Sequence, residues 1–582
     1  MDDILTVEQF SLDLRREKVW NPILHEISFT LKKKETLGIV GESGSGKSVT
    51  ALSIMRLLES KMAKNSGKLL FFDSNLQKQI ALDNLSEKEM QKIRGDKIAM
   101  IFQEPMTSLN PVMKCGAQIT EALLLHTKLS KKEAKLRVLE LFHEVMLPRP
   151  EKIFEAYPFE LSGGQKQRVM IALAMSCNPD ILIADEPTTA LDVTVQKGIL
   201  ELIKKLQVKY NMSVIFITHD LGVVVEIADR VLVMYKGEIV ERGDAKQVFA
   251  HPQHPYTQGL LACRPSMDRR LKLLPTIDDF MRQQDDFSSV SLSEKLNKHT
   301  ISNEERESTH KHLYETEPIL KIENLSKIYP LRKEKLFEKR QYLKALDQIN
   351  LEVYEGETLG LVGESGCGKT TLGRSIIRLI EPTAGQIYYK GMLLNTLSPK
   401  ALRKVRKELQ IILQDPYSSL NQRIKIGDAL MEPMRVHGLF GNDKQRKQKV
   451  IELLERVSLN ETHFYRYPHE FSGGQRQRIA IARALAVNPR FIICDESVSA
   501  LDVSVQAQVL NLLNELKREF GLTYIFISHD LSVVKFMSDR MAVMKEGKIV
   551  ELNEADEIYR HPATPYTQQL IDAIPGVKSS FL

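Results

Sequence analysis

Short, mostly apolar runs recur along this chain, and each run ends at glycine or at polar residues. In the first half they occupy residues 36–40, 98–102, 181–184 and 214–217. Several apolar residues in a row, rich in Ile, Leu and Val, predict strands that are buried on both faces, as in a parallel sheet. Stretches with apolar residues every three or four positions follow them and predict helices. This alternation predicts an α/β fold.

The same pattern occurs a second time, about 310 residues further along the chain. Opening strands are predicted at residues 4–12 and 319–327, and helical subdomains at 113–156 and 422–466. A chain of 582 residues is also too long for one hydrophobic core. The internal repeat therefore predicts two domains of similar architecture.

The predicted domains are residues 1–281 and 318–582, joined by a linker at 282–317. The linker has few large apolar residues and carries five basic and eight acidic side chains. A segment of this composition buries too little apolar surface to fold alone, so we expect it to be flexible.

A glycine-rich turn follows the first apolar strand of each half. Residues 41–48 read GESGSGKS and residues 363–370 read GESGCGKT, and a predicted helix follows each. Strand, glycine-rich turn and helix together direct backbone N–H groups at one point, as in a phosphate-binding loop. One such match could arise by chance, but two in matched positions argue against chance. We expect Lys47 and Lys369 to bind the β- and γ-phosphates, and Ser48 and Thr370 to bind Mg²⁺.

Two adjacent carboxylates end another apolar strand in each half. They are Asp185 and Glu186 in the first half and Asp495 and Glu496 in the second. Open α/β sheets bind ligands at the carboxyl ends of their strands. Adjacent side chains of a strand point in different directions, so we expect the aspartate to bind Mg²⁺ and the glutamate to polarise an attacking water. The alternative is a simple strand-end cap.

Single polar residues end two further strands in each half. Gln103 and Gln414 each follow a buried-strand pattern and precede an acidic residue and a proline. His219 and His529 each follow an Ile-Phe-Ile run. A lone histidine at a strand end is usually structural, but the matched pair favours a role at the γ-phosphate.

A Ser-Gly-Gly-Gln sequence precedes a strong helix pattern in each half, at residues 162–165 and 472–475. It places free N–H groups and the positive end of a helix dipole at one point. Alone, such a sequence indicates only a turn and a helix cap. Because it occurs twice at the repeat offset, we interpret it as a second phosphate-binding device that must face another anion site.

Two features leave alternatives open. Tyr329, near the end of the second opening strand, is a candidate for stacking on an adenine ring, with Trp20 as its possible substitute in the first half. Both could instead be ordinary core or surface aromatics.

Each half also closes with a proline-rich tail, at residues 251–260 and 561–570. We interpret the tails as docked short helices rather than as histidine metal sites.

Composition narrows the possible classes. The chain has 81 basic and 75 acidic side chains, a net charge of +6, which does not suggest a nucleic-acid protein. Its five cysteines lack metal-ligand spacing and are expected to be free thiols in a reducing compartment. We find no signal-peptide pattern and no apolar run of about 18 residues, so we expect a cytosolic chain or one held at a membrane by partners.

The order of these motifs resembles that of ATP-binding cassettes of ABC transporters. Phosphate loop, glutamine, Ser-Gly-Gly-Gln signature, paired carboxylates, Ala-Leu-Asp and histidine follow one another in both halves. The sequences at 103–110 and 414–421 and both tails are similar to those of dipeptide, oligopeptide and nickel importer ATPases. The fused arrangement resembles glutathione- or microcin-type peptide importers. The resemblance implies two P-loop NTPase domains, each with a RecA-like core, an antiparallel β subdomain and a helical signature subdomain.

The resemblance also implies ATP hydrolysis with Mg²⁺ at two sites. These sites would form when the two cassettes of the chain pair, with the signature of each cassette opposite the phosphate loop of the other. The implied catalytic residues are Glu186, Glu496, His219, His529, Gln103 and Gln414. The implied Mg²⁺ ligands are Ser48, Gln103, Asp185, Thr370, Gln414 and Asp495. The implied nucleotide-binding residues are Gly41, Ser43, Gly44, Gly46, Lys47, Ser48, Val49, Gly363, Ser365, Gly366, Gly368, Lys369, Thr370, Thr371, Ser162, Gly163, Gly164, Gln165, Ser472, Gly473, Gly474, Gln475 and Tyr329.

The implied partners are two transmembrane permease subunits and, indirectly, an extracytoplasmic solute-binding protein, with no nucleic acid. The chain would then lie peripherally at the cytoplasmic face of the cell membrane. Dipeptides, oligopeptides, glutathione, peptide antibiotics and nickel all remain possible cargoes, with peptides favoured. The alternatives are an exporter or a soluble twin-cassette ATPase of the translation-factor type. The latter typically carries a basic interdomain arm, whereas residues 282–317 are net acidic.

Overall fold

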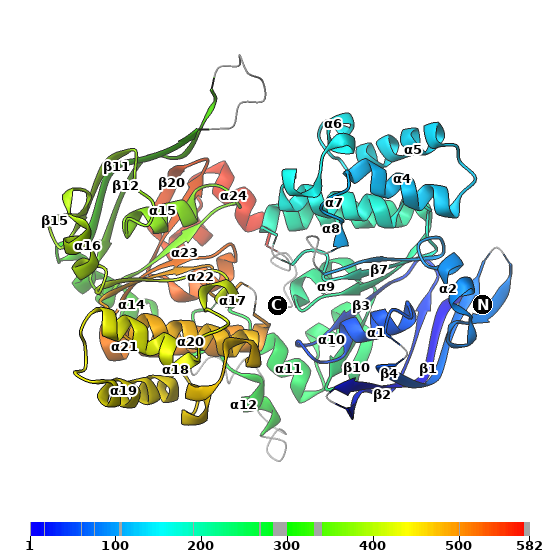
Figure 1. The fold of residues 1–582 in the computed structure, drawn as a ribbon, viewed down its shortest axis with the longest axis horizontal. Coiled ribbons are helices and arrows are strands. Elements are labelled where there is room, and N and C mark those ends of the chain that lie inside the picture. The colour runs from blue at the N-terminus through cyan, green and yellow to red at the C-terminus, as the bar shows by residue number, and fades with distance from the viewer. Residues whose placement is uncertain are drawn as a thin grey trace. The chain divides into compact units, whose positions relative to one another are not determined.

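The structure is a computed structural model that describes residues 2–16, 18–59, 61–74, 76–103, 108–189, 191–266, 269–282, 300–330, 340–499 and 501–574. It contains two compact units (Figure 1). Of the described residues, those up to 261 and 277–282 belong to the first unit, and 262–276 and 300–574 belong to the second. Residues 104–107 of the first glutamine segment and 283–299 of the predicted linker lie outside the described residues.

The first unit opens with an antiparallel sheet of four strands in the order β2-β1-β4-β5. The long hairpin of β1 and β2 pairs Arg15 with Trp20 near its turn. Leu5, Val7 and Phe10 of β1 are buried in a core shared with the next sheet. The strands are β1 (Asp3–Arg16), β2 (Val19–Lys32), β4 (Ala63–Asp73) and β5 (Lys78–Ala81).

The second sheet of this unit has six strands in the order β10-β9-β3-β8-β7-β6. Its neighbouring strands are parallel except for β10, which is antiparallel to β9. Every residue of β3, β7 and β8 is buried, which confirms the interpretation of the apolar runs. The strands are β3 (Thr36–Val40), β6 (Ile98–Ile101), β7 (Ile181–Asp185), β8 (Ser213–Ile217), β9 (Arg230–Tyr235) and β10 (Glu238–Asp244).

Helices complete the first unit, and α4, α5 and α6 pack together beside α7 as the predicted helical subdomain (Figure 1). Val138, Leu141 and Phe142 form the buried face of α5, with the three- and four-residue spacing expected of an amphipathic helix. The helices are α1 (Lys47–Ile54), α2 (Glu87–Ile93), α4 (Cys115–His126), α5 (Lys131–Glu144), α6 (Pro150–Glu155), α7 (Gly163–Ala174), α8 (Val193–Tyr210), α9 (Leu221–Ile227), α10 (Ala245–Ala250), α11 (Pro255–Ala262) and α12 (Ile277–Met281).

The second unit repeats this plan, with sheets in the orders β12-β11-β14-β15 and β16-β17-β18-β13-β19-β20. Its strands are β11 (Pro318–Pro330), β12 (Tyr342–Tyr354), β13 (Thr358–Val362), β14 (Ala384–Tyr389), β15 (Met392–Leu393), β16 (Leu409–Ile412), β17 (Phe491–Asp495), β18 (Thr523–Ile527), β19 (Arg540–Lys545) and β20 (Lys548–Glu554). Its helices are α15 (Lys369–Ile376), α16 (Pro399–Val405), α17 (Pro416–Ser419), α18 (Ile426–Val436), α19 (Asp443–Arg456), α20 (Gly473–Leu485), α21 (Val503–Phe520), α22 (Leu531–Met537), α23 (Ala555–Arg560) and α24 (Pro565–Asp572).

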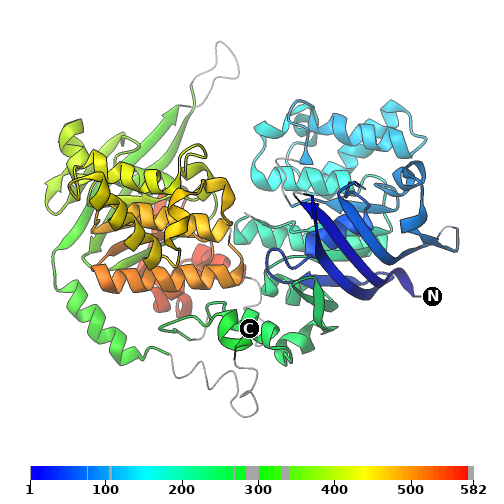
Figure 2. The ribbon, with the colours of Figure 1, turned by 60° about the horizontal axis from the view of Figure 1, so that its bottom comes forward.

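Part of the predicted linker has regular structure. Residues Asn303–Tyr314 form helix α14, which Figure 2 shows as a green helix along the second unit. Its N-cap is Ser302, whose side chain accepts a hydrogen bond from the backbone N–H of Glu305. The ring of Tyr314, at the end of the helix, packs edge-on against Tyr354 with ring centroids 5.1 Å apart. The helix is therefore held by the second unit and does not stand alone.

A cluster of ion pairs joins the connecting segments to the second unit. Arg306 of α14 pairs with Glu554 and Asp556. Arg270, which precedes α12, lies 3.6 Å from Asp556 and donates to the carbonyl of Ser538. At the positions of the first unit that match Glu554 and Asp556 stand Asp244 and Lys246. A cluster of this composition is thus specific to the second unit.

Asn511 of α21 also holds the segment before α12. Its side-chain amide donates to the carbonyl of Leu274 at 2.8 Å, and its side-chain oxygen accepts from the Leu274 N–H at 2.9 Å. Leu271 and Leu274 are themselves buried. Glu201 occupies the matching position in the first unit.

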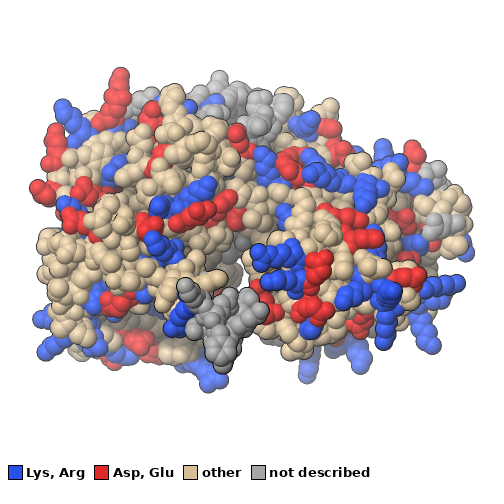
Figure 3. Space-filling model, turned by 90° about the horizontal axis from the view of Figure 1, so that it is seen from above, with Lys and Arg blue, Asp and Glu red and all other residues tan. Residues whose placement is uncertain are grey.

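Among the described residues, no helix is both long enough and apolar enough to cross a bilayer. On the face shown in Figure 3, basic and acidic side chains are interspersed. This pattern agrees with the near balance of 81 basic and 75 acidic residues in the chain.

Candidate functional site

The first phosphate loop connects the buried strand β3 to helix α1. Gly41 has φ of 147°, and a Cβ there would lie 2.2 Å from the carbonyl oxygen of Met234, so only glycine fits. Gly46, the N-cap of α1, has φ of 104°. A Cβ on Gly44 would meet nothing within 4 Å, so the loop is open on that side. The backbone thus curls around a space that can receive a phosphate group.

Lys47 lies within the curl of this loop. It is 5% exposed, and its Nζ donates to the carbonyl oxygens of Gly41 and Glu42 at 2.6 and 2.8 Å. Lys369 makes the same contacts with Gly363 and Glu364 at 2.7 and 3.0 Å. A buried ammonium next to an open loop is suited to binding a polyanion.

A hydroxyl and a carboxylate meet beside each loop. Ser48 Oγ donates to Asp185 Oδ1 at 3.0 Å, and Thr370 Oγ1 donates to Asp495 Oδ1 at 2.9 Å. Asp495 is fully buried, and its Oδ2 has no hydrogen-bond partner among the described residues. Hydroxyl and carboxylate oxygens are the ligands Mg²⁺ prefers, so these pairs fit that cation.

Asp185 and Asp495 are held in an environment that opposes their charge. Burial, helped by the charge of Glu186, raises the pKa of Asp185 to about 6 against the hydrogen bond from Ser48. Burial likewise raises the pKa of Asp495. A cation bound at these carboxylates would relieve the cost of burying them.

The glutamate that follows each of these aspartates has a lowered pKa instead of a raised one. Burial acts to raise the pKa of Glu186, but His219, Thr189 and Lys47 outweigh burial and lower this pKa to about 2. His219 Nδ1 lies 3.3 Å from Glu186 Oε2, and Gln103 Nε2 donates to the same oxygen at 3.0 Å. The structure therefore brings together the three residues predicted as catalytic in this half.

The second half reproduces this group. Gln414 Nε2 donates to Glu496 Oε2 at 2.6 Å, and His529 Nδ1 lies 3.7 Å from the same oxygen. Burial opposes the charge of Glu496, yet His529 and Lys369 lower its pKa. Glu186 and Glu496 share φ of 48°, an uncommon left-handed conformation.

Each signature sequence caps a helix. Ser162 Oγ accepts from the N–H of Gln165, whose side-chain oxygen accepts from the Ser162 N–H, at the start of α7. Ser472 and Gln475 form the same capping box at α20. Both serines are exposed. The first helical turn, which includes Gly163 and Gly164 in one case and Gly473 and Gly474 in the other, can therefore meet an anion from outside.

Comparison with known families decides the assignment. A family model described as ABC transporter matches residues 24–189 and 346–499, together more than half of the chain. The chain belongs to the ABC transporter family. Its two units are ATP-binding cassettes. A second family model, described as Oligopeptide/dipeptide transporter, C-terminal region, matches residues 240–289 and 550–580.

Curated relatives match nearly the whole chain. A protein named Glutathione import ATP-binding protein GsiA from Escherichia coli O6:H1 is 48% identical over 578 residues, covering 99% of this chain and 90% of the relative. Proteins of the same name from Escherichia coli (strain K12) and Shigella flexneri are 47% and 48% identical with the same coverage. Among solved structures, a dimeric cassette MJ0796 bound to ADP and Pi aligns with 40% of this chain and 98% of its own, at 30% identity and a TM-score of 0.37.

The two cassettes are therefore ATP-binding domains of an ATPase that couples hydrolysis to transport. The predicted fold class is confirmed, because each cassette combines an antiparallel sheet, a mostly parallel core sheet and a helical subdomain. The roles of the individual site residues stay predictions.

The candidate adenine-stacking residues lie near the turns of the opening hairpins. Tyr329 is half-buried, opposite Leu343, with the Lys327 ammonium 5.1 Å from its ring centroid. Trp20 is 42% exposed, with the Arg15 guanidinium 5.9 Å from its ring. A stacking role for either residue stays a prediction.

A pair of tyrosines in the C-terminal regions was missed by the sequence reasoning. Tyr256 Oη accepts a hydrogen bond from the N–H of Glu42, and Tyr566 Oη accepts one from Glu364, so each tyrosine reaches a phosphate loop. The recurrence of Pro-Tyr-Thr-Gln in both tails was the available signal, but the sequence does not reveal its partner.

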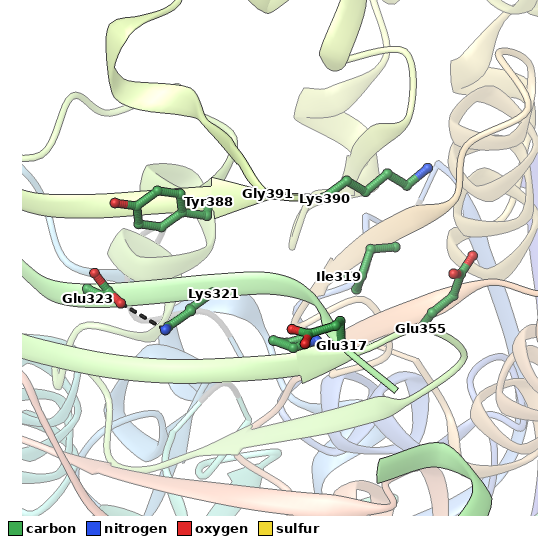
Figure 4. A pocket seen from close by; sticks show the side chains of 9 residues that line it. Glu317, Ile319, Lys321, Glu323, Glu355, Tyr388, Lys390 and Gly391 are labelled. Atoms are coloured by element: carbon green, nitrogen blue, oxygen red, sulfur yellow. Dashed lines mark ion pairs between the residues drawn. The ribbon is translucent and has the colours of Figure 1, made fainter. Parts of the chain in front are cut away.

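A hollow of about 530 Å³ lies at the start of β11 (Figure 4). Lys321 and Glu323, joined by an ion pair of 2.9 Å, line it together with Tyr388. None of the predicted site residues lines this hollow. Tyr329 lies at the opposite end of β11 from this hollow.

Proposed function

We propose that this chain hydrolyses ATP at two sites to drive an importer for peptides or for a peptide-like solute such as glutathione. The observation that carries the proposal is the duplicated group of Lys47, Ser48, Asp185, Glu186 and His219, which recurs in the second cassette with the same contacts. The C-terminal regions of the oligopeptide/dipeptide type, present after both cassettes, support the solute class.

The roles within each site follow from charge and contact. The loop N–H groups and Lys47 bind the phosphates, while Ser48 and Asp185 hold Mg²⁺, with Gln103 as a further ligand. Mg²⁺, when bound, neutralises charge that develops on the phosphate oxygens. Glu186 stays ionised because its pKa is about 2, so it can orient and polarise a water.

His219 and Gln103 hold the reacting groups in place. Both contact the same oxygen of Glu186. Arrival of a γ-phosphate would offer these donors a new acceptor and leave Glu186 free to act on water. In the second site the equivalent residues are His529, Gln414 and Glu496.

Each signature helix start is proposed to complete the ATP site of the other cassette. The exposed Ser-Gly-Gly turn supplies N–H groups and a helix dipole that a triphosphate can use. ATP would then hold the cassettes together, and hydrolysis would release them. The duplication of both half-sites in one chain supports this arrangement.

The proposed partners are two transmembrane permease subunits, with a solute-binding protein on the far side of the membrane. Closure of the cassettes would then change which side of the permeases is open. The chain would act at the cytoplasmic face of the membrane. The name of the curated relatives, which refers to glutathione import, makes glutathione the first solute to test.

The test is purification of the tagged full-length chain from detergent-solubilised membranes, with mass spectrometry of the proteins that accompany it. The expected result is two polytopic membrane proteins in stoichiometric amounts, and uptake of labelled glutathione or peptide by cells that express these three proteins together with the solute-binding protein. The Glu186→Gln, Glu496→Gln variant is the matched control and should recover the same proteins without uptake. Recovery of ribosomes and no membrane protein would contradict the proposal.

A further inference from the structure

Each phosphate loop is contacted from outside by a tyrosine of the C-terminal region that follows it. Tyr256 and Tyr566 are the second residues of α11 and α24. The N–H of Glu42 donates to Tyr256 Oη at 2.9 Å, and the N–H of Glu364 donates to Tyr566 Oη at 3.2 Å. The contacts span 214 and 202 residues of sequence, so the fold makes them and local sequence does not.

The contacted peptide is the one at which the loop starts to turn. Glu42 directly follows Gly41, and the carbonyl oxygens of both accept hydrogen bonds from Lys47 Nζ. The tyrosine thus fixes the N–H of a residue whose carbonyl holds the phosphate-binding lysine. A shift of this residue would move the lysine and the first N–H groups of the loop together.

The tyrosine rings are themselves held firmly. Tyr256 is fully buried, with its ring centroid 4.3 Å from that of Tyr235. Tyr566 is 8% exposed, and the Lys545 ammonium lies 4.7 Å from its ring centroid. Neither hydroxyl can follow a moving loop without disturbing this packing.

A glutamate at the same place in both cassettes anchors the start of each tail. The carboxylate of Glu241 accepts from the N–H groups of Gln253 and His254 at 2.8 and 3.2 Å. The carboxylate of Glu551 accepts from those of Ala563 and Thr564 at the same distances. The tail helix is therefore tied to the second strand of the β9–β10 or β19–β20 hairpin before it reaches the loop.

The same hairpins touch the loops through backbone groups. The N–H of Gly237 donates to the carbonyl of Ser45 at 3.1 Å, and that of Gly547 donates to the carbonyl of Cys367 at 2.9 Å. Hairpin and tyrosine thus contact opposite halves of each loop. A buried tyrosine that only filled the core would not need a partner within the phosphate loop in both cassettes.

We propose that Tyr256 and Tyr566 are positioning residues for ATP, each holding its phosphate loop in the geometry that receives the β- and γ-phosphates. The C-terminal region of the oligopeptide/dipeptide type thereby supports the nucleotide site of its own cassette. This inference rests on the proposed role of the phosphate loops.

Replacing tyrosine by phenylalanine removes only the hydroxyl. The N–H of Glu42 then loses its acceptor, and the loop gains freedom that ATP must remove when it binds. A single hydrogen bond of this kind corresponds to about a three- to tenfold loss of ATP affinity at that site. The rate at which bound ATP is hydrolysed should change little, because Glu186 and His219 follow other strands, β7 and β8.

The experiment titrates the full-length chain with MgATP and with inorganic tripolyphosphate by calorimetry. The parent carries Glu186→Gln and Glu496→Gln so that ATP persists, and Tyr256→Phe with Tyr566→Phe is added to it. Both ligands should bind about three- to tenfold more weakly, because tripolyphosphate reports on the loop without the nucleoside. Tyr235→Phe, which removes a hydroxyl from the ring beside Tyr256, is the matched control and should leave both Kd values unchanged.

A Kd within twofold of the parent for both ligands would overturn the inference, even with a lower melting temperature, because that result describes a merely structural tyrosine. An equal loss of affinity in Tyr235→Phe would also overturn it. Failure of the parent itself to bind ATP would overturn the proposed function and this inference together. Normal binding by both parent and tyrosine variant would overturn the inference alone.

Discussion

His219 Nδ1 lies 3.3 Å from Glu186 Oε2. His529 and Glu496 make the same contact at 3.7 Å. The contact stabilises the ionised glutamate and helps to lower the pKa of Glu186 to about 2 against the effect of burial. In the proposed mechanism the histidine keeps this ionised glutamate in place, and arrival of a γ-phosphate would free it to act on water.

Replacement of both histidines by alanine should slow ATP turnover about 10²-fold, as expected when a reacting group is misplaced by about 1 Å. ATP affinity should stay nearly unchanged, because Lys47 and the loop N–H groups remain. Steady-state phosphate release together with a binding titration measures both quantities. Unchanged turnover would show that the His219–Glu186 contact has no catalytic role.

Asp185 predicts a pH dependence of stability. Its pKa is raised from 3.8 to about 6, so the neutral carboxyl stabilises the folded state relative to the unfolded state. This contribution to the free energy of unfolding is complete below pH 3.8 and is lost as pH rises through about 6. This pKa shift corresponds to about 3 kcal/mol in the free energy of unfolding. Asp185→Asn should therefore be more heat-stable than the parent at pH 8 without Mg²⁺ or nucleotide.

The advantage of Asp185→Asn should shrink towards pH 4, where the parent carboxyl is neutral. Calorimetric melting at a series of pH values measures it. Ser48→Ala, which removes the hydroxyl that donates to Asp185, serves as the comparison and should not show a gain that grows with pH. A pH-independent difference between Asp185→Asn and the parent would contradict the assignment.

The ion pairs of the connecting segment predict a local effect. In Arg306→Ala, Glu554 and Asp556 lose one partner but keep Arg270 beside them, a change that corresponds to about 1.5–3 kcal/mol. Amide exchange in α14 should become about 10- to 10²-fold faster. The control is Lys272→Ala, which removes an exposed pair with Glu305 in the same segment and should have little effect. Equal exchange rates in the two variants would contradict this account.

The sequence predicts most of the fold because the parallel strands are fully buried. Runs such as those at 181–184 and 214–217 have no polar face to conceal their pattern, and the repeat doubles every signal. The glycines of the phosphate loops are equally informative, since position 41 has no room for a Cβ and only glycine fits there. The contacts of Asp185, Glu186 and Gln103 follow from where the strands end.

Contacts between distant segments could not be predicted in the same way. Residues 303–314 have little apolar periodicity, and the helix is held by Arg306 and Tyr314, whose partners lie far along the chain. The hydrogen bond from Glu42 to Tyr256 likewise joins residues 214 positions apart. Such pairings depend on the assembled fold, which composition and periodicity do not describe.

The most direct test of the central claim is phosphate release from MgATP by the purified full-length chain and by its Glu186→Gln, Glu496→Gln variant. We expect both proteins to bind ATP with similar Kd and the variant to turn over about 10²–10⁴-fold more slowly, as for the loss of a general base. Near-normal turnover in the variant would contradict the assignment of Glu186 and Glu496 and with it the proposed mechanism.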